Sequence, residues 1–308
     1  MSEFGDDDPA TAGDVQIAPW DGRRVPVTLL GGYLGAGKTT VINELLARTD
    51  RPIAVLVNDV GAVNVDASLI KRRHGDTIEL TDGCVCCSLS RGLVDAFDEL
   101  RARPTPPDQV VLELSGVADP RRVMPWADSI GFRLDSVVVL VDVDQFPDRI
   151  DDAIVGPTVQ AQLNAGDVLV LSKTDLVDED RIRAVTDHLA TSHPDVPVFH
   201  AGTAGATAAL LQTGTRRSRG FADVPDAELF DAHDVSVVTV EQPLGVDALD
   251  ALLDGLPDDV LRAKAVIDID TGVTVQVHVV GPRRTITPLP QAETQETTDL
   301  VVIRPRYR

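Results

Sequence analysis

Residues 31–40 read GGYLGAGKTT and stand directly between an apolar run, VPVTLL at 25–30, and a helical pattern that begins at residue 39. From Gly32 to Thr39 the spacing is G-x-x-x-x-G-K-T, in which glycines let successive backbone N–H groups turn inward around phosphate oxygens. Such a phosphate-binding loop (P-loop) needs a buried strand before it and a helix N-terminus after it. An ordinary glycine-rich turn is the alternative, but the flanking strand and helix favour the P-loop.

Short, β-branched apolar runs recur along the first two thirds of the chain. They stand at 25–30, 53–58, 109–114, 136–142, 167–172 and 196–200, and segments with helical spacing, such as TTVINELLAR and LSRGLVDAFDELRAR, lie between them. Strands that are buried on both faces show this pattern. We therefore predict an α/β fold of the P-loop NTPase type, with a mostly parallel sheet flanked by helices.

Changes in composition divide the chain into four segments. Residues 1–24 lack periodicity and predict a disordered acidic tail, and residues 25–213 form the predicted P-loop domain. Residues 214–233 gather Gly, Arg and Asp, as a linker does. At 234–308 the runs DVSVVTVE, VDALDALLDGL, VLRAKAVIDID, VTVQVHVV and DLVVIR predict a small α+β domain, with PLPQAETQETTD as a loop.

The P-loop predicts a nucleoside triphosphate site that also uses Mg²⁺. The Lys38 ammonium would reach the β- and γ-phosphates, and the Thr39 hydroxyl would bind Mg²⁺. The backbone around these two side chains would hold the phosphates. The predicted nucleotide site therefore also includes Gly32, Gly35, Ala36, Gly37 and Thr40.

The run LSKTDL at 171–176 follows a predicted strand, at the edge where open α/β sheets bind their ligands. The Asp175 carboxylate could accept two hydrogen bonds from guanine, and the stem of Lys173 could lie across the base. Adenine does not present these donors in that arrangement, so GTP is the preferred nucleotide. The usual motif has Asn where this chain has Ser172, which weakens or replaces one contact. An exposed turn is the alternative interpretation.

Two other loops contain candidate catalytic residues. In VVLELSGVADP at 110–120, Glu113 could hold Mg²⁺ through water and the Gly116 backbone N–H could face the γ-phosphate. A capping acid at a strand end is the alternative for Glu113. In NDVGAVNVDASLI at 58–70, either Asp59 or Asp66 could contact Mg²⁺ or orient the attacking water, and we take Asp66 as the candidate. A plain solvated loop is the alternative there.

All three cysteines of the chain, Cys84, Cys86 and Cys87, stand within TDGCVCCSLS at 81–90. Thiolates are soft ligands that suit Zn²⁺ and Cu(I), and three ligands leave an open position of the kind that metal delivery needs. Cys86 and Cys87 would point to opposite faces of a strand, so this segment can surround one ion only as a loop. Small buried apolar residues and a redox switch are the alternatives.

Charge and hydropathy narrow the possible partners. The chain has 28 Lys plus Arg against 49 Asp plus Glu, a net charge of −21, so nucleic acid is not expected to bind. Because 39 of the acids are Asp and only 4 of the bases are Lys, the surface resembles that of proteins from a very salty, halophilic cytoplasm. No run approaches the roughly 18 apolar residues of a membrane span, so we expect a cytoplasmic protein with reduced thiols and no membrane partner.

In this order, GGYLGAGKTT, GCVCC, ELSGVADP, SKTD and LRAK resemble the CobW-type metallochaperone GTPases, relatives of the urease and hydrogenase nickel-insertion GTPases. The resemblance implies a GTPase that binds Zn²⁺ or Co²⁺ through the C-x-C-C thiols. The chain departs from the family in its switch loop, where Ala62 stands at the position of an expected Glu, and at Ser172. The His-rich stretches of many members are also missing.

We therefore predict a GTPase that couples hydrolysis to metal transfer, with an unknown client metalloprotein or cobalamin-type pathway as the recipient. A nucleotide-dependent homodimer is a further expectation. The alternative from another functional class is a nucleotide-gated metal buffer or sensor with negligible turnover. It is considered because Ala62 stands where a switch-loop carboxylate is expected. A small-molecule kinase has less support, since kinases need neither GCVCC nor SKTD.

Overall fold

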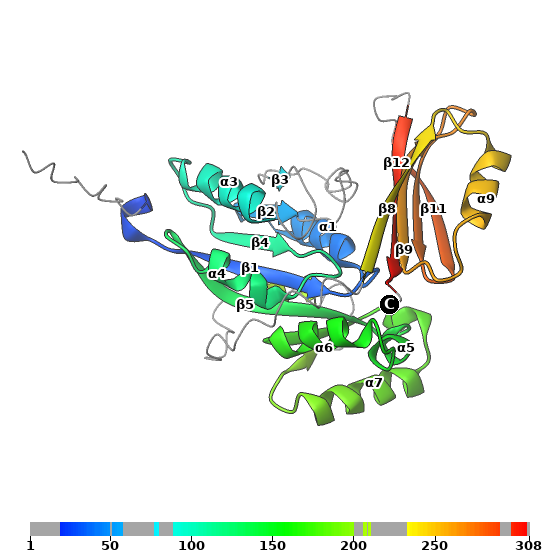
Figure 1. Ribbon diagram of the computed structural model, residues 1–308. Coiled ribbons are helices and arrows are strands. Elements are labelled where there is room, and N and C mark those ends of the chain that lie inside the picture. The colour runs from blue at the N-terminus through cyan, green and yellow to red at the C-terminus, as the bar shows by residue number, and fades with distance from the viewer. Residues whose placement is uncertain are drawn as a thin grey trace, which may run out of the picture.

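The computed structural model describes residues 19–49, 51–57, 77–79, 89–199, 206–207, 209–210, 233–289 and 297–306. These residues form two sheets with helices packed on them (Figure 1). The first sheet and its helices come from the N-terminal two thirds of the chain, and the second sheet from the C-terminal third.

The first sheet has seven strands in the order β3-β2-β4-β1-β5-β6-β7, and every neighbouring pair is parallel. The P-loop strand therefore lies at the centre, and the carboxyl ends of all strands meet at one edge of the sheet. The strands are β1 (Val25–Gly32), β2 (Ile53–Val57), β3 (Thr77–Glu79), β4 (Gln109–Glu113), β5 (Phe132–Asp142), β6 (Val168–Ser172) and β7 (Val198–Phe199).

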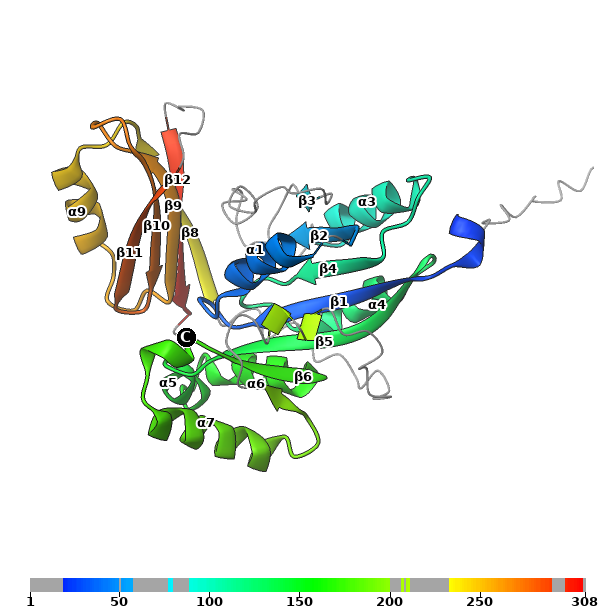
Figure 2. The ribbon, with the colours of Figure 1, turned by 180° about the vertical axis from the view of Figure 1, so that it is seen from behind.

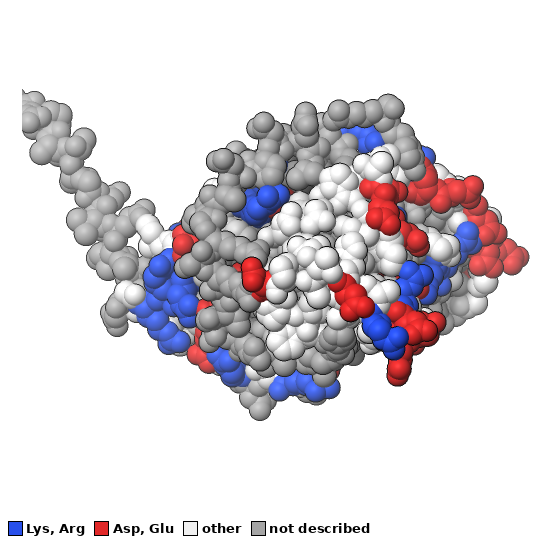
Figure 3. All heavy atoms as spheres, turned by 90° about the horizontal axis from the view of Figure 1, so that it is seen from below, with Lys and Arg blue, Asp and Glu red and all other residues white. Residues whose placement is uncertain are grey.

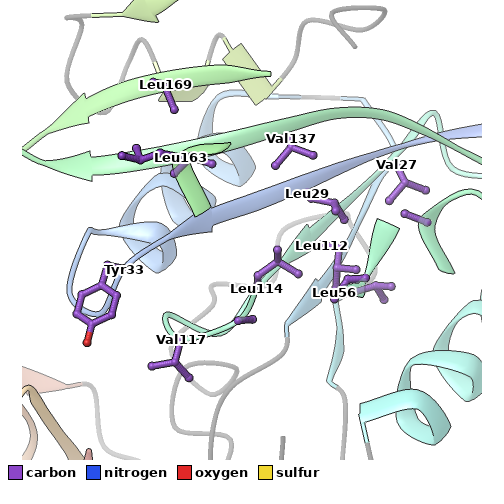
Figure 4. Packing of buried hydrophobic residues seen from close by; sticks show 14 of the residues in the cluster. Val27, Leu29, Tyr33, Leu56, Leu112, Leu114, Val117, Val137, Leu163 and Leu169 are labelled. Atoms are coloured by element: carbon purple, nitrogen blue, oxygen red, sulfur yellow. The ribbon is translucent and has the colours of Figure 1, made fainter. Parts of the chain in front are cut away.

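Successive strand residues enter two different hydrophobic clusters, because side chains alternate across a sheet. Leu29, Leu56 and Leu112 belong to the cluster on one face (Figure 4), whereas Leu30 and Val111 belong to the cluster on the other. The helices α3 (Leu89–Arg101), α4 (Met124–Ala127), α5 (Phe146–Ile150), α6 (Gly156–Ala165) and α7 (Glu179–Ser192) contribute to the first cluster, and α1 (Lys38–Arg48) to the second. Burial on both faces explains the continuously apolar strands.

The second sheet has five strands in the order β11-β10-β9-β12-β8, and each neighbouring pair is antiparallel. Its only described helix, α9 (Val246–Asp254), covers the face turned away from the first sheet (Figure 2). The strands are β8 (His233–Glu241), β9 (Arg262–Asp268), β10 (Thr274–Val280), β11 (Arg283–Leu289) and β12 (Thr297–Pro305).

The second sheet packs directly against the P-loop end of the first sheet. Leu261 and Ile303 enter the same hydrophobic cluster as the strands of the first sheet. A Cβ atom added to Gly35 would lie 2.5 Å from Val280 Cγ1, so the P-loop backbone touches β10. The two sheets consequently meet in a buried contact beside the P-loop.

The structure confirms the predicted fold class: a parallel sheet flanked by helices, followed by a small antiparallel α+β unit. It corrects the predicted tail, which was expected to reach residue 24. Pro19–Gly22 form a 3₁₀ helix, and the Trp20 ring packs edge-on against Phe132 at 5.5 Å. Trp20 also donates a hydrogen bond from Nε1 to the Arg103 carbonyl oxygen at 2.9 Å, and one anchoring residue produces no hydrophobic periodicity in the sequence.

The strand β11 was not predicted, because six of its seven residues are exposed and offer no apolar alternation. No helix in the described part of the chain is both long and apolar enough to cross a membrane. Figure 3 shows one face of the molecule, on which small groups of acidic and basic side chains are interspersed.

Candidate nucleotide-binding site

The P-loop forms at the end of β1 through glycines in the left-handed backbone region. Gly35 has φ 80° and Gly37 has φ 95°, values that a side chain disfavours. The helix α1 begins at Lys38, immediately after Gly37, so its first N–H groups point into the loop. The Lys38 side chain is buried, and its Nζ donates to the Gly32 carbonyl oxygen at 2.8 Å. This arrangement is a cradle for an anion.

Thr39 and Glu113 lie together next to the P-loop. The strand β4 pairs with β1 so that Glu113 stands opposite Leu30, and the Thr39 hydroxyl donates to Glu113 Oε1 at 3.4 Å. A hydroxyl and a carboxylate are the hard oxygen ligands that Mg²⁺ prefers, beside the place where phosphates would add theirs. The residues present therefore fit a magnesium ion, which Thr39 would hold directly and Glu113 directly or through water.

Gly116 lies against the P-loop for a steric reason. A Cβ atom at this position would approach the Leu34 backbone nitrogen to 2.9 Å, which leaves room only for glycine. The buried Gln162 side chain of α6 holds this segment, since its Nε2 donates to the carbonyl oxygens of Gly116 at 2.9 Å and Ala118 at 3.0 Å. Sequence reasoning missed Gln162, because a polar residue on a helix has no local signal for such a contact.

The predicted guanine-binding residues follow β6 at the same edge of the sheet. Lys173 has φ 57°, and its Nζ donates to Asp142 Oδ2 at 2.6 Å. The Ser172 hydroxyl donates to the Val141 carbonyl oxygen at 3.3 Å, and Asp175 is exposed in the 3₁₀ helix Thr174–Leu176. Sequence reasoning also missed Asp142, although an acid at the end of an apolar strand was a visible signal.

The second sheet closes the other side of the P-loop. A pocket of about 290 Å³ is lined by Gly35, Gly37, Lys38, Thr39, Thr40, Asn43 and Glu113 from the first unit, and by Arg262, Lys264, Gln276, His278 and Leu289 from the second. Sequence analysis used LRAK only as part of a family resemblance. The available signal was the presence of Arg262 and Lys264 among the apolar residues of β9, because cations are seldom buried.

His278 lines this pocket, and cationic side chains lie near enough to its imidazole to affect its pKa. Burial lowers the pKa of His278 to about 3, with further lowering by Arg262, Lys264, Lys173 and Lys38. The imidazole is therefore neutral at physiological pH. The four cationic residues come from β9, from the predicted guanine-binding motif and from the P-loop, three parts of the chain that are distant in sequence.

A buried hydrogen bond joins the P-loop to the start of β8. The Tyr33 hydroxyl lies 2.7 Å from His233 Nε2, and the Arg149 guanidinium stacks over the Tyr33 ring at 5.9 Å. Burial lowers the pKa of His233 to about 4 and raises the pKa of Tyr33. Both groups are therefore neutral, and the tautomer of His233 decides which of the two donates the hydrogen bond.

Several predicted residues lie outside the described part of the chain: Asp66 and Asp59, Ala62, and the cysteines Cys84, Cys86 and Cys87. Their roles stay predictions. Among the residues that the structure describes, no three His, Cys, Asp or Glu side chains are grouped so that they could hold a metal ion.

Comparisons with known proteins match both units of the chain. The family described as CobW/HypB/UreG, nucleotide-binding domain, matches residues 26–200, and the cobalamin synthesis protein cobW C-terminal domain matches residues 234–306. A zinc chaperone CobW from a Sinorhizobium species is 28% identical over 307 aligned residues, which cover 84% of this chain and 86% of that protein.

Two further comparisons concern one Escherichia coli protein. The zinc chaperone YjiA is 34% identical over 185 residues, 57% of each chain. A crystal structure of the Zn(II)-bound YjiA GTPase superposes with a TM-score of 0.45 at 21% identity, covering 92% of this chain and 95% of that one.

Proposed function

The chain belongs to the CobW/HypB/UreG family of nucleotide-binding GTPases, and from this premise we propose that it couples GTP hydrolysis to the transfer of a transition metal. The cargo would be bound by the thiols of Cys84, Cys86 and Cys87, with Zn²⁺ or Co²⁺ as the ion. Zinc has the stronger support, because the relatives that match this chain are named zinc chaperones.

One observation carries the enzymatic part of the proposal: Thr39 and Glu113 meet at 3.4 Å beside the buried Lys38 ammonium. Lys38 would hold the β- and γ-phosphates, and Thr39 with Glu113 would hold Mg²⁺. The ion, when bound, neutralises charge on the phosphates. The exposed Asp175 would accept hydrogen bonds from guanine while Asp142 fixes the Lys173 ammonium at 2.6 Å.

A nucleotide-gated metal buffer or sensor is the second candidate, and the replacement of an expected switch-loop Glu by Ala62 favours it. Such a protein would bind GTP and metal with negligible turnover. A client metalloprotein, a nucleotide-dependent homodimer and a cytoplasmic, halophilic setting remain predictions from the sequence.

Steady-state turnover separates these candidates. We expect the full-length protein to hydrolyse GTP in the presence of Mg²⁺ and to release GDP and phosphate, with a rate that changes when Zn²⁺ or Co²⁺ is added. Binding of GTP and zinc without phosphate release would favour the buffer. Transfer of the phosphoryl group to an acceptor other than water would favour a kinase.

The identity of the metal is tested by elemental analysis of protein purified under reducing conditions. We expect one tightly bound Zn²⁺ or Co²⁺ in the wild type and none in Cys84→Ser/Cys86→Ser/Cys87→Ser. Equal metal content in the two proteins would contradict the assignment of the three thiols.

A further inference from the structure

The second sheet presents two buried cations to the P-loop. Lys264 of β9 pairs with His278 of β10, and Arg262 pairs with Val280, so these side chains share one face of the sheet. The intervening residues, such as Ala263 and Ala265, pack in the hydrophobic cluster that contains α9. Arg262 and Lys264 thus interrupt an apolar strand on the face that lies toward the first sheet.

These two side chains are nearly as inaccessible as the P-loop lysine. Arg262 is 8% exposed and Lys264 is 5% exposed, and both line the same pocket as Lys38 and Thr39. Among the described residues that line this pocket, Lys38, Arg262 and Lys264 are cationic and Glu113 is the only acid. The pocket is therefore cationic in a protein whose net charge is −21.

The positions of the few lysines in the chain also indicate an anion site beside the P-loop. The chain has only four lysines, and three of them, Lys38, Lys173 and Lys264, lie close enough to His278 to lower its pKa. Cationic side chains that line one pocket attract an anion, and a bound anion screens the repulsion between them. Lysine binds phosphate as a compact point charge, and arginine binds it through two parallel N–H groups.

We propose that Lys264 and Arg262 bind the phosphate chain of the nucleotide in the P-loop, so that the second sheet forms one wall of the nucleotide site. The inference rests on the proposed function, because it takes GTP as the ligand. The pocket is lined by Lys38, which would hold the β- and γ-phosphates, and by Thr39 and Glu113, which would hold Mg²⁺. GTP therefore holds the second sheet against the P-loop more tightly than GDP does.

Calorimetric titration of the protein with a non-hydrolysable GTP analogue or with GDP, each in the presence of Mg²⁺, tests this assignment. We expect Lys264→Gln and Arg262→Gln each to weaken the analogue roughly ten- to hundred-fold, the range for a lost hydrogen bond to a charged group, and to weaken GDP less. Lys264→Arg keeps the charge and should retain most of the affinity.

Arg284→Gln is the matched control. Arg284 pairs across the strands with Val279, so it lies on the opposite face of the same sheet, and its exposed guanidinium contacts Asp254. This variant removes one positive charge from the same sheet without touching the pocket, and we expect no change in either affinity. If Arg284→Gln weakened nucleotide binding equally, the effect would come from net charge alone, and the proposal would be overturned.

Hydrogen exchange of the wild type gives a second measurement that requires no variant. Amides of β9 and β10 should exchange more slowly with the GTP analogue than with GDP. Equal exchange in the two states, or wild-type affinities in folded Lys264→Gln and Arg262→Gln, would overturn the inference. Failure of the wild type itself to bind GTP would instead overturn the proposed function, which keeps the two outcomes distinct.

Discussion

At the scale of single residues, the buried Lys38 ammonium is the group on which nucleotide chemistry depends most. Its Nζ donates to the Gly32 carbonyl oxygen and so already points across the loop that would hold the phosphates. Because a lysine charge at this position neutralises the β- and γ-phosphates, its loss should affect phosphoryl transfer far more than the fold.

We predict that Lys38→Ala abolishes GTP hydrolysis while the protein still folds. Phosphate release measures the activity, and far-UV circular dichroism with thermal unfolding measures the fold. Turnover that persists in a folded Lys38→Ala protein would show that another loop holds the nucleotide.

Asp175 is expected to select the base. Asp175→Asn should weaken GTP and strengthen xanthosine triphosphate, because the amide can donate to the C2 oxygen that replaces the amine of guanine. The affinities of the wild type and of Asp175→Asn for GTP and for xanthosine triphosphate measure this change of preference. A site that hydrogen-bonds the base can discriminate strongly between such nucleotides. Unchanged GTP affinity in Asp175→Asn would contradict the base assignment.

At the scale of elements, the contact between the P-loop and β10 depends on a glycine. A Cβ atom at Gly35 would lie 2.5 Å and 2.8 Å from the two Cγ atoms of Val280, which is β-branched and buried, so it cannot move aside easily. Gly37 also has positive φ, but a Cβ there would meet no atom within 4 Å.

We predict that Gly35→Ala lowers the free energy of unfolding by roughly 1–3 kcal/mol more than the control Gly37→Ala does. Both variants strain the backbone, whereas only the first forces the second sheet away from the P-loop. Denaturant unfolding without nucleotide measures the difference. The double variant Gly35→Ala/Val280→Ala should recover part of the loss, and equal stability of the two single variants would contradict the contact.

The buried pair of Tyr33 and His233 predicts a pH dependence of stability. The groups that face His233 are Tyr33, Arg149, Arg306, Asp152 and Asp234, and burial is the main cause that lowers its pKa to about 4. Between pH 6.5 and pH 4 His233 therefore binds a proton in the unfolded chain but stays neutral in the folded chain. The free energy of unfolding consequently falls as the pH falls through this window.

His233→Gln should remove this contribution, because the glutamine side chain can form a hydrogen bond with Tyr33 without titrating. Between pH 7 and pH 5 the wild type should lose roughly 2 kcal/mol more than the variant, an order-of-magnitude figure from the shift in pKa. Denaturation midpoints at each pH measure both proteins. Parallel pH profiles would contradict a neutral, buried His233.

At the scale of the whole molecule, metal binding and nucleotide binding should be coupled. The GCVCC segment lies in the sequence between the predicted switch loop at 58–70 and Glu113, which neighbours the P-loop. A movement of the switch loop on loss of the γ-phosphate would then reach the thiols. Linkage requires that metal shifts the GTP/GDP preference by the same factor that nucleotide shifts the metal affinity.

We predict metal affinities that differ about 5- to 150-fold between the GTP-analogue and GDP states, the range of typical coupling. Competition with a chromogenic chelator measures both states in the wild type and in Cys84→Ser/Cys86→Ser/Cys87→Ser. Equal affinity in the two states, or undiminished tight binding in the triple variant, would exclude nucleotide-driven transfer through these thiols.

The amino-acid sequence by itself determined the central features of the molecule. Continuous apolar runs predict strands buried on both faces, and the glycine spacing around Lys38 is meaningful only between a strand and a helix, so fold class and P-loop could both be read locally. Tertiary structure alone decided which distant residues meet. Only the docking of sheets and helices brings the P-loop region together with Arg262, Lys264, His278, Gln162 and Asp142. Some of these residues carry a local signal, such as an acid at a strand end, but no local pattern encodes which distant residues they contact.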